Sequence, residues 1–344
     1  MAGLAHAAGQ VWPAFALVTG LLLVGVVAEQ DGLFAAAGAA LARMPGGSRA
    51  LYVVALALVA VVTAVLNLDT SVFFLTPVLL HLARARGADE APFLYGAVFM
   101  SNAASLYLPG SNLTNLIVLH GEHVDGAAFL GRMWPAAVAS TVVTALVLLL
   151  LFHRELGRAQ DAGSERAPVR IGIGAAGVLA ATVLVLVLSS PALPVLAVGV
   201  AAVLLDRTPR RRLTAAVDLR VLIGLLGLAV VLGGVGRWWH GPSSYVHSLG
   251  RWQTSVATAV AAIVVNNLPA SVLLTPTPPV HARELLLGLN LGPNLAVTGS
   301  LSAFLWLRVA RSLDAQPSVA RYTRLGLVLV PVSLVAALAA LRLL

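Results

Sequence analysis

Two stretches of sequence, NLDTSVFFLTP from Asn67 to Pro77 and NLPASVLLTP from Asn267 to Pro276, decide the fold. With one deletion allowed, both read Asn-Leu, then Ser-Val, then Leu-Thr-Pro, and each interrupts a long hydrophobic segment. Polar residues and prolines leave backbone groups unpaired in hydrocarbon, so such breaks persist only where protein surrounds them or where they line a wet cavity. A matched pair of broken segments, one in each half of the chain, indicates a transporter built from internal repeats with a site near the membrane midplane.

The composition of the whole chain is that of an α-helical membrane protein. Of its 344 residues 59% are hydrophobic and 10% are charged, and the apolar runs are continuous rather than alternating as in a β-barrel. The chain has no cysteine, which excludes disulfides, thiolate metal sites and cysteine nucleophiles. Its net charge of +8 comes from arginines scattered over several loops, which favours cytoplasmic loops and lipid contact over nucleic-acid binding.

We expect two inverted repeats joined by a linker. The first repeat would cover residues 1–152, with a re-entrant hairpin at about 50–83 and a broken helix at about 92–120. Residues 153–216 would supply linking helices and cytoplasmic loops. The second repeat, 217–344, would contain a hairpin at about 252–280 and a broken helix at about 285–310. The predicted fold class is an all-α polytopic membrane protein with about eight full crossings.

The distribution of arginine supports the hairpin arrangement. If both ends of each hairpin lie on one side, all but five arginines fall on the same face. The positive-inside rule then makes this face cytoplasmic, in the inner (plasma) membrane, and places both termini outside. The five arginines of the other face are Arg132, Arg237, Arg251, Arg283 and Arg342.

Four polar clusters interrupt the hydrocarbon, at 67–70, 101–115, 266–269 and 290–300. In an inverted-repeat fold each half contributes one hairpin tip and one broken-helix loop, and all four meet near the bilayer centre. Half-helix N-termini offer N–H groups and a positive dipole end, while Asn, Ser and Thr add donors and acceptors. Such a site suits a small solute with several hydroxyls, an oxyanion or Na⁺. The alternative is that these residues only join helices together.

Asp69 is the one acidic residue, of 14, that falls inside a hydrophobic stretch. A carboxyl group there is costly to ionise and could carry a proton, or it could instead cap the helix that follows. The second repeat has Pro269 at the aligned position, so any carboxylate role is asymmetric. A metal-like spacing occurs in a predicted external loop, where solvated side chains are the expected reading, and no metal site or cofactor is predicted. Its members are His120, Glu122, His123 and Asp125.

These clusters resemble those of the arsenite efflux permeases, the arsenical pump membrane protein family of the ion transporter superfamily. The matching pieces are NLDTSVFFLTP, NAASLYLPGSNLTNLIV, VVNNLPA and GLNLGPNLAVTGSLSAFLWLRV, and with the spans between them they cover nearly the whole chain. The resemblance implies secondary active export of arsenite or antimonite by proton antiport, with substrate and ions bound at the hairpin tips and unwound loops. Carried over, the binding positions are Asn67, Asp69, Thr70, Ser111, Asn112, Thr114, Asn266, Asn267, Asn294, Thr298 and Ser300, with Asp69 coupling the proton.

The chain departs from the family pattern in two places. Relatives usually carry two further helices ahead of the first span, which we expect to be absent here or to lie upstream of this start. They also often carry an acidic residue just before the Gly-Pro pair, where this chain has Asn290. Proton coupling would then rest on Asp69 alone, or the cation would differ. Without cysteine, arsenic(III) would be held by hydrogen bonds to its hydroxyls, and the lack of an intramembrane arginine argues against a dicarboxylate.

Two transport alternatives stay open, a sodium/proton antiporter and a transporter of another small anion on the same fold. An intramembrane enzyme is disfavoured because the chain has no HExxH motif, paired aspartates or cysteine nucleophile. The expected partners are the small solute, H⁺ or Na⁺ and the lipid bilayer. A homodimer stays open, as does an ATPase subunit on the arginine-rich loops 153–170 and 206–216, as in some relatives.

Overall fold

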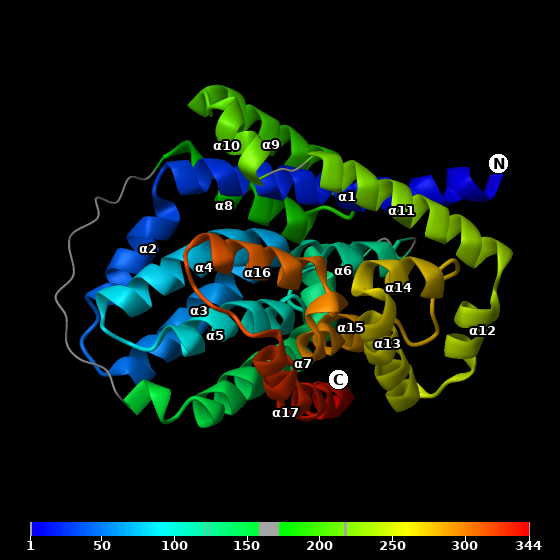
Figure 1. Ribbon diagram of the computed structural model, residues 1–344. Helices are drawn as coiled ribbons and strands as arrows, with labels where there is room; N and C mark the ends of the chain where they lie inside the picture. Colours follow the sequence, from blue (N-terminus) through cyan, green and yellow to red (C-terminus); the bar gives the residue numbers. More distant parts are fainter. Residues whose placement is uncertain (1, 121, 123, 158–171, 217–218, 344) are drawn as a thin grey trace.

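The computed structural model describes residues 2–120, 122, 124–157, 172–216 and 219–343 (Figure 1). Over these residues the regular structure is entirely helical, and no strand occurs. The continuous apolar runs therefore form helices, and the predicted all-α class is confirmed.

The helices follow the apolar segments of the sequence closely. The first part of the chain forms α1 (Ala2–Gln30), α2 (Leu33–Ala42), α3 (Ser48–Val65), α4 (Leu68–Ala85), α5 (Glu90–Ala104), α6 (Leu113–Val118) and α7 (Gly126–Leu151). The middle forms α8 (Ile173–Val187), α9 (Ala192–Asp206) and α10 (Arg210–Ala216). The last part forms α11 (Leu219–Trp238), α12 (Gly241–Ser248), α13 (Arg251–Val265), α14 (Asn267–Leu274), α15 (Ala282–Leu291), α16 (Leu301–Ser312) and α17 (Val319–Ala340). Two of these were not expected: α10 lies in a predicted cytoplasmic loop at 206–216, and α12 precedes the predicted hairpin at 252–280.

Helices α3 and α4 form the first hairpin, with Asn67 at its tip. The Asn67 backbone is extended, and its side chain accepts a hydrogen bond from the Thr70 N–H at 2.7 Å, which starts α4. At the far end, the Arg86 guanidinium donates to the carbonyl oxygens of Ala42 at 2.8 Å and Gly46 at 3.0 Å. Because Gly46 precedes α3 and Arg86 follows α4, the two arms return to the same end of the molecule.

The second hairpin, α13 and α14, is shorter than its counterpart. Its arms have 15 and 8 residues, against 18 and 18 in the first hairpin. The segment TPTPPV after α14 contains three prolines, which cannot continue a helix, whereas α4 runs through the single Pro77. The helix of the second arm therefore ends at Leu274, whereas the predicted hairpin extends to about residue 280. Arg251 and Glu284 form an ion pair at 3.5 Å, which brings the start of α13 to the start of α15.

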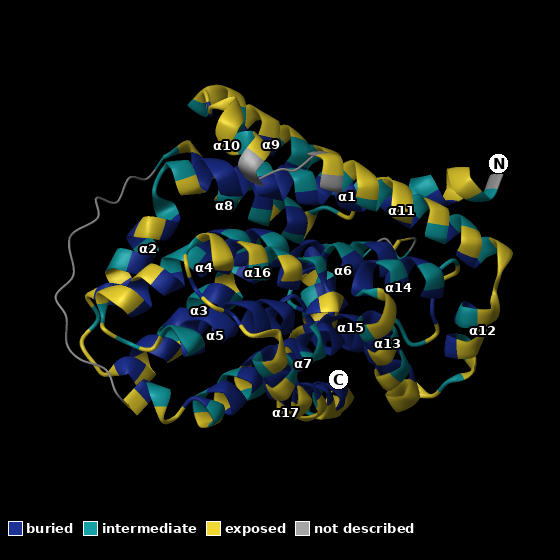
Figure 2. Cartoon of the chain, in the orientation of Figure 1, coloured by how far each residue is buried: buried dark blue, intermediate teal, exposed yellow. Residues whose placement is uncertain are grey.

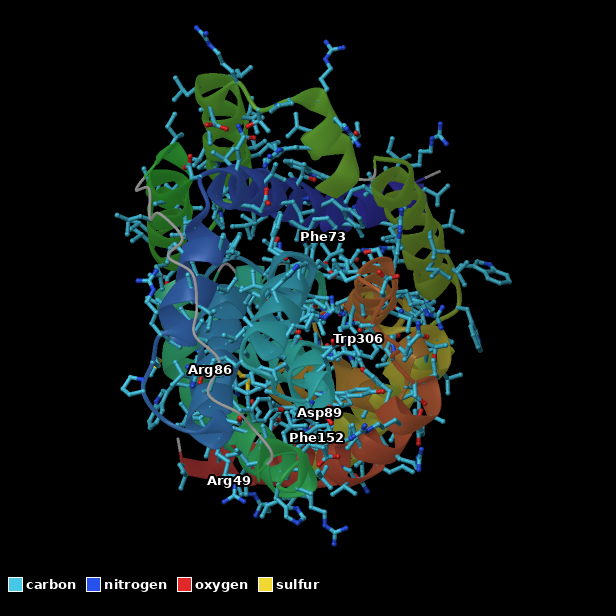
Figure 3. All side chains as sticks on the ribbon, turned by 60° about the vertical axis from the view of Figure 1, so that its left-hand side comes forward. Arg49, Phe73, Arg86, Asp89, Phe152 and Trp306 are labelled. Carbon is cyan, nitrogen blue, oxygen red and sulfur yellow. The ribbon has the colours of Figure 1, made fainter. Side chains whose placement is uncertain are left out.

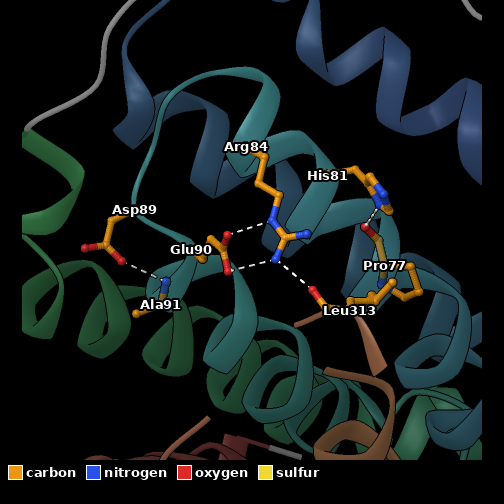
Figure 4. A network of polar contacts seen from close by, with 7 residues as sticks. All are labelled: Pro77, His81, Arg84, Asp89, Glu90, Ala91 and Leu313. Carbon is orange, nitrogen blue, oxygen red and sulfur yellow. Dashed lines mark hydrogen bonds and ion pairs between the residues drawn. The ribbon is translucent and has the colours of Figure 1, made fainter. Parts of the chain in front are cut away.

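The helices that start at the breaks run in opposite directions: the hairpin arm of each repeat points the opposite way from its counterpart, and so does the second half of each broken helix. From the centre of the molecule, α4 and α16 extend to one end and α6 and α14 to the other (Figure 1). Arg84 joins three chain segments at the first end: it bonds Glu90, the first residue of α5, at 2.7 Å and the Leu313 carbonyl, just after α16, at 2.9 Å (Figure 4). Thus α5 begins where α16 ends, which is the geometry of inverted repeats.

Five described helices are long and apolar enough to cross a membrane: α1, α3, α4, α7 and α17. A sixth arises if α11 and α12, which meet at 71°, count as one span. Helices α3 and α4 are the hairpin arms, so they do not count as full crossings. The predicted total of about eight full crossings therefore includes segments that are broken or shorter. These are the broken helices α5–α6 and α15–α16 and the apolar helices α8 and α9, in addition to α1, α7, α11 and α17.

The broken helices lie at the core of the fold. All residues of α5 from Pro92 to Ala104 and all of α15 from Glu284 to Leu291 are buried, whereas α9, α10 and α11 carry many exposed positions (Figure 2). The backbone breaks are therefore enclosed by protein rather than facing lipid, as the cost of unpaired backbone groups in hydrocarbon requires.

Glycines let α1 and α9 pack at close range. A Cβ atom at Gly20 would lie 2.7 Å from the backbone nitrogen of Leu196, and one at Gly199 would lie 2.6 Å from the carbonyl oxygen of Gly20. Such small-residue contacts replace the hydrophobic drive for helix association that is missing inside a membrane.

We predict that Gly199→Ala destabilises the protein by about 1–3 kcal/mol, because the added methyl group meets backbone that cannot move aside alone. The measurement is the apparent melting temperature in detergent, followed by size-exclusion chromatography of heated samples. Gly9→Ala in α1, where nothing lies within 4 Å of the added atom, is the matched control and should leave the melting temperature unchanged or slightly raised. Equal behaviour of the two variants would contradict close α1–α9 packing.

Candidate functional site

Four helix N-termini meet at the centre of the fold. They belong to α4 and α14, the second arms of the two hairpins, and to α6 and α16, the second halves of the two broken helices (Figure 1). Each helix carries a positive dipole end and unpaired N–H groups in its first turn. Their convergence creates a region of positive potential that is made by backbone rather than by basic side chains.

A short polar side chain caps each of these four helices. The side chains of Asn67 and Asn112 accept hydrogen bonds from the N–H groups of Thr70 and Thr114, at 2.7 and 3.1 Å. The corresponding caps of α14 and α16 are Asn266, bonded to the Leu268 N–H at 3.2 Å, and Ser300, bonded to the Ala303 N–H at 3.2 Å. Capping explains why an Asn or a Ser stands directly before the first turn of each of these helices. It also leaves other first-turn N–H groups available to a ligand.

The four N-termini enclose a cavity of about 30 Å³, which we call the four-helix cavity. This volume accommodates about two water molecules. Larger cavities occur in the structure, but none of them joins all four N-termini. The lining residues are Leu68, Asp69, Asn112, Leu113, Thr114, Asn267, Leu268, Ser300, Leu301 and Ser302.

Several buried polar atoms at this site lack a protein partner. They are the Nδ2 atom of Asn67 and the hydroxyl oxygens of Thr70 and Thr114, all from side chains that are at most 1% exposed. A buried polar group without a partner costs about 1–3 kcal/mol, so native proteins retain few of them. Of the three, only Thr114 lines the cavity, and its hydroxyl is a group that a solute or water there can satisfy.

Asp69 is the one acidic residue that lines the four-helix cavity. It lies in the first turn of α4, where the helix dipole favours a negative charge. No hydrogen bond or ion pair joins its carboxyl group to another described side chain. The sequence therefore located a carboxyl group that faces the cavity and is not paired in a salt bridge with a described residue.

All eight asparagines of the chain lie in the four breaks, and Asn290 is the centre of their contacts. Its Oδ1 atom accepts from Asn112 Nδ2 and from the Ser105 hydroxyl, both at 2.6 Å. Its Nδ2 atom donates to Asn115 Oδ1 at 2.8 Å and to the Leu286 carbonyl at 2.8 Å. One fully buried side chain thus joins α15 to the whole break between α5 and α6.

A second asparagine pair repeats this connection. Asn102 Nδ2 donates to Asn294 Oδ1 at 2.8 Å, and Asn294 Nδ2 donates to the Phe99 carbonyl at 3.2 Å. The predicted set named Asn294 but omitted Asn102, Asn115 and Asn290. Their presence in the polar clusters was visible in the sequence, but only the fold shows that they bond to one another.

An aromatic cluster fixes the second broken helix against α5 and α17. Trp306 lies in the interior of the molecule (Figure 3). It donates its indole N–H to the Leu94 carbonyl at 2.8 Å and packs beside the Tyr95 and Tyr322 rings. The Tyr322 hydroxyl donates to the Pro293 carbonyl in the break at 3.0 Å. The break after α15 is therefore held by Tyr322 of α17 in addition to the asparagine contacts.

The predicted binding residues fall into three groups in the structure. Lining the cavity are Asp69, Asn112, Thr114, Asn267 and Ser300. Buried beside it or within the breaks are Asn67, Thr70, Ser111 and Asn294, and the half-buried Asn266 caps α14. Thr298 is exposed and does not line the cavity, although its carbonyl accepts from Asn266 Nδ2 at 3.0 Å. Ser302, which bonds Ser300 at 2.9 Å, lines the cavity and was not predicted.

The metal-like group in the predicted external loop does not assemble in the described part of the chain. No group of three or more His, Cys, Asp or Glu side chains with a metal-binding arrangement occurs among the described residues. His123, one member of the group, lies outside the described residues, as does the segment 158–171 of the predicted cytoplasmic loop.

Comparison with known proteins places the chain among membrane transporters. Residues 3–282 match the CitMHS family, described as a citrate transporter. Two arsenical pump membrane proteins of Escherichia coli are 24% and 25% identical to this chain, over 97% of its length and 86% of theirs. The silicon efflux transporter LSI3 of Oryza sativa subsp. japonica is 28% identical over 42% of this chain and 30% of its own.

Two solved structures share the fold. The YdaH transporter of Alcanivorax borkumensis superposes with a TM-score of 0.59 at 15% identity, covering 99% of this chain and 86% of the other. MtrF of Neisseria gonorrhoeae gives 0.52 at 15% identity, covering 98% and 82%. These likenesses extend over the whole chain and concern the fold alone.

We predict that Asn290→Leu lowers the apparent melting temperature by roughly 6–12 °C, because it leaves the Nδ2 atom of Asn112 and the Oδ1 atom of Asn115 buried without partners. Thr298→Val is the matched control: it removes a polar side chain from the same broken helix, but an exposed one, and should change the melting temperature little. A small effect of both substitutions would show that the Asn290 contacts do not hold the two breaks together.

Proposed function

The chain belongs to the CitMHS family of membrane transporters, and from its four-helix cavity we propose that it exports arsenite or antimonite in exchange for protons. Transport rather than catalysis is the proposed activity, since the cavity offers ligand groups but no nucleophile and base in a catalytic arrangement. The observation that carries the proposal is the convergence of four capped helix N-termini on one small polar cavity that also holds a single carboxyl group.

The chemistry of the cavity suits a small hydroxylated solute. At neutral pH arsenite is the neutral acid As(OH)₃, whose hydroxyls both donate and accept hydrogen bonds. First-turn N–H groups and the side-chain amide of Asn267 can donate to its oxygens, while the Asp69 carboxylate and the Thr114 hydroxyl can accept from its O–H groups. Because the chain has no cysteine, hydrogen bonds are the means of holding arsenic(III).

The size and charge of the cavity favour this solute over citrate. Citrate is a trianion at neutral pH and is recognised best by arginine or lysine. No arginine, lysine or histidine lines the four-helix cavity, and its volume of about 30 Å³ is small even for a hydroxide of arsenic, so it must widen on binding. The family description alone therefore does not determine the substrate of this chain.

The relatives support the same substrate class. The names of the similar proteins specify an arsenical pump and a silicon efflux transporter. Arsenic(III) and silicon share one feature in water: near neutral pH both occur as small, uncharged hydroxides. A cavity of backbone N–H groups and hydroxyls is suited to that shared form.

We assign proton coupling to Asp69. An ionised carboxylate accepts a hydrogen bond from a substrate hydroxyl, whereas the protonated group presents a donor to the same place. Proton and substrate therefore compete, and exclusive occupancy is what an antiporter requires. Movement of the hairpin arms past the broken helices would expose the cavity to each side in turn.

A sodium/proton antiporter is the second candidate. The observation in its favour is the same unpaired Asp69 carboxylate beside the hydroxyl of Thr114, because oxygen ligands suit hard cations. Against it stand the four positive helix ends, which repel a cation that carries its full charge.

The orientation follows from the arginines. In the described part of the chain the ion pairs Arg84–Glu90, Arg212–Glu29 and Arg321–Glu155 lie at the arginine-rich end, and Arg251–Glu284 lies at the other. We propose that the arginine-rich end faces the cytoplasm and that both termini lie outside. The division into repeats at 152 and 216, a homodimer and a cytoplasmic ATPase subunit are further parts of this proposal.

We predict that Asp69→Asn abolishes proton-driven arsenite uptake into everted membrane vesicles, because the amide cannot exchange a proton. Asp314→Asn is the matched control: Asp314 is an exposed loop residue at φ 60°, a conformation that Asn tolerates well, and uptake should persist. Uptake retained in Asp69→Asn would move the coupling elsewhere. Absence of uptake by the parent protein in sealed, energised vesicles would reject arsenite as substrate.

We also predict that Thr114→Val raises the KM for arsenite about 3–10-fold, because the cavity loses one hydrogen bond to the solute. Thr63→Val provides a stringent control, since both hydroxyls are fully buried without a protein partner but only that of Thr114 lines the cavity. Initial rates in vesicles at several arsenite concentrations separate KM from the maximal rate. An equal change in both variants would assign the effect to packing.

A further inference from the structure

A second polar cavity lies at the end of the molecule opposite the arginine-rich one. It has a volume of about 410 Å³ and is formed by α7, the start of α13 and the start of α15. Three arginines line it, each from a different helix: Arg132 from α7, Arg251 from α13 and Arg283 from α15. We call it the three-arginine pocket.

This concentration of arginine is unusual for that end of the chain. Only five arginines are assigned there by the sequence, and three of them meet in this pocket. The positive-inside rule explains arginines at the opposite end, but it does not explain basic side chains that gather here. A negatively charged ligand bound in this pocket explains why these arginines gather here.

Two of the three arginines are uncompensated. Arg251 pairs with Glu284, a side chain that is 7% exposed, at 3.5 Å. Arg132 and Arg283 have neither a hydrogen-bond nor an ion-pair partner in the described part of the chain. Glu122 also lines the pocket and balances its charge in part, and His281 is a further lining residue, but no carboxylate is bonded to either of these two guanidinium groups in the described part of the chain.

The pocket lies at the level of the membrane interface. Trp134 and Trp252 are 49% and 38% exposed and lie close in sequence to Arg132 and Arg251. Exposed tryptophans prefer the boundary between hydrocarbon and headgroups. The deeper wall of the pocket is apolar and includes Phe129, Met133 and Leu286. Arginines above an apolar wall match a phosphate group attached to a lipid.

We propose that the three-arginine pocket binds a phosphate group, either that of an anionic phospholipid or free phosphate. Guanidinium groups bind phosphate oxygens in pairs of parallel hydrogen bonds. A phosphate held by Arg132 and Arg283 joins α7 to the first turn of α15, and through the Arg251–Glu284 pair it is connected to α13. The bound group stabilises the second hairpin against α7. This proposal does not depend on the identity of the transported solute.

The test compares two phosphate sources on purified protein in a non-ionic detergent. One arm adds phosphatidylglycerol to the micelles, with phosphatidylcholine as the lipid control. The other adds inorganic phosphate, with chloride at equal ionic strength as its control. The readout is the apparent melting temperature, and we expect phosphatidylglycerol to raise it by about 3 °C.

Three variants assign the effect to the pocket. The double variant Arg132→Gln with Arg283→Gln should lose most of the rise, without loss of folding since neither side chain has a partner in the described protein. The double Lys variant should keep part of it, because lysine still binds phosphate as a point charge. Arg342→Gln is the matched control: Arg342 belongs to the same end but contacts the Trp252 ring at 5.5 Å and does not line the pocket.

Each outcome has a definite meaning. A rise with phosphatidylglycerol that the double Gln variant loses supports the proposal and identifies a lipid as the source. A rise with inorganic phosphate that the same variant loses supports it with free phosphate as the source. No rise in either arm, or an equal rise in the parent and the double Gln variant, overturns the proposal.

Discussion

The structure depends on one constraint, the need to satisfy helix ends inside the membrane. Each of α4, α6, α14 and α16 begins near the centre of the fold, where first-turn N–H groups have no partner within their own helix. In hydrocarbon such groups must bond to protein, water or a ligand. The caps, the asparagine contacts and the burial of α5 and α15 all serve this requirement. At the four-helix cavity the protein itself does not meet this requirement in full.

Bonded and unpartnered polar groups occur together in the breaks. Asparagines of the two broken helices bond to one another, and Asn290 and Asn294 connect the two breaks. At the tip of the first hairpin, the amide nitrogen of Asn67 and the hydroxyl of Thr70 lack partners, as does the hydroxyl of Thr114 at the start of α6. The asparagine contacts thus hold the two broken helices together, while a hairpin tip and a broken helix both keep polar groups free to bond a solute or water.

Sequence alone predicted the features that local chemistry controls. The repeated motif located both hairpin tips, and the residues Asn67, Asn112, Asn266 and Ser300 cap helices as their side chains favour. The predicted end of the second hairpin, at about residue 280, was too late, because the prolines that follow Leu274 cannot continue α14.

The sequence alone also could not predict which distant residues contact one another. Asn290 and Asn115 are far apart in the chain and meet only because the second repeat is inverted against the first. The exposure of Thr298 depends on the direction of its side chain in a 3₁₀ turn that bears no sequence signal. Motif position therefore predicts which segments approach the site, while the fold decides which side chains face it.

The two halves of the site have the same backbone plan but different charge, and this difference bears on transport. Asp69 and Pro269 occupy aligned positions in the first turns of α4 and α14. Both residues suit a first turn: aspartate interacts well with the helix dipole, and proline lacks an N–H that would have no partner there. The exchange therefore keeps a residue suited to the first turn and removes the carboxyl group from one repeat, although α14 is capped by Asn266, one residue earlier than the alignment with Asn67 implies. Asp69 is the one titratable side chain that lines the cavity, so the proposed antiport through it would carry one proton for each cycle. In that proposal the inverted repeats supply the two-sided access, and the asymmetry at this one position sets the coupling.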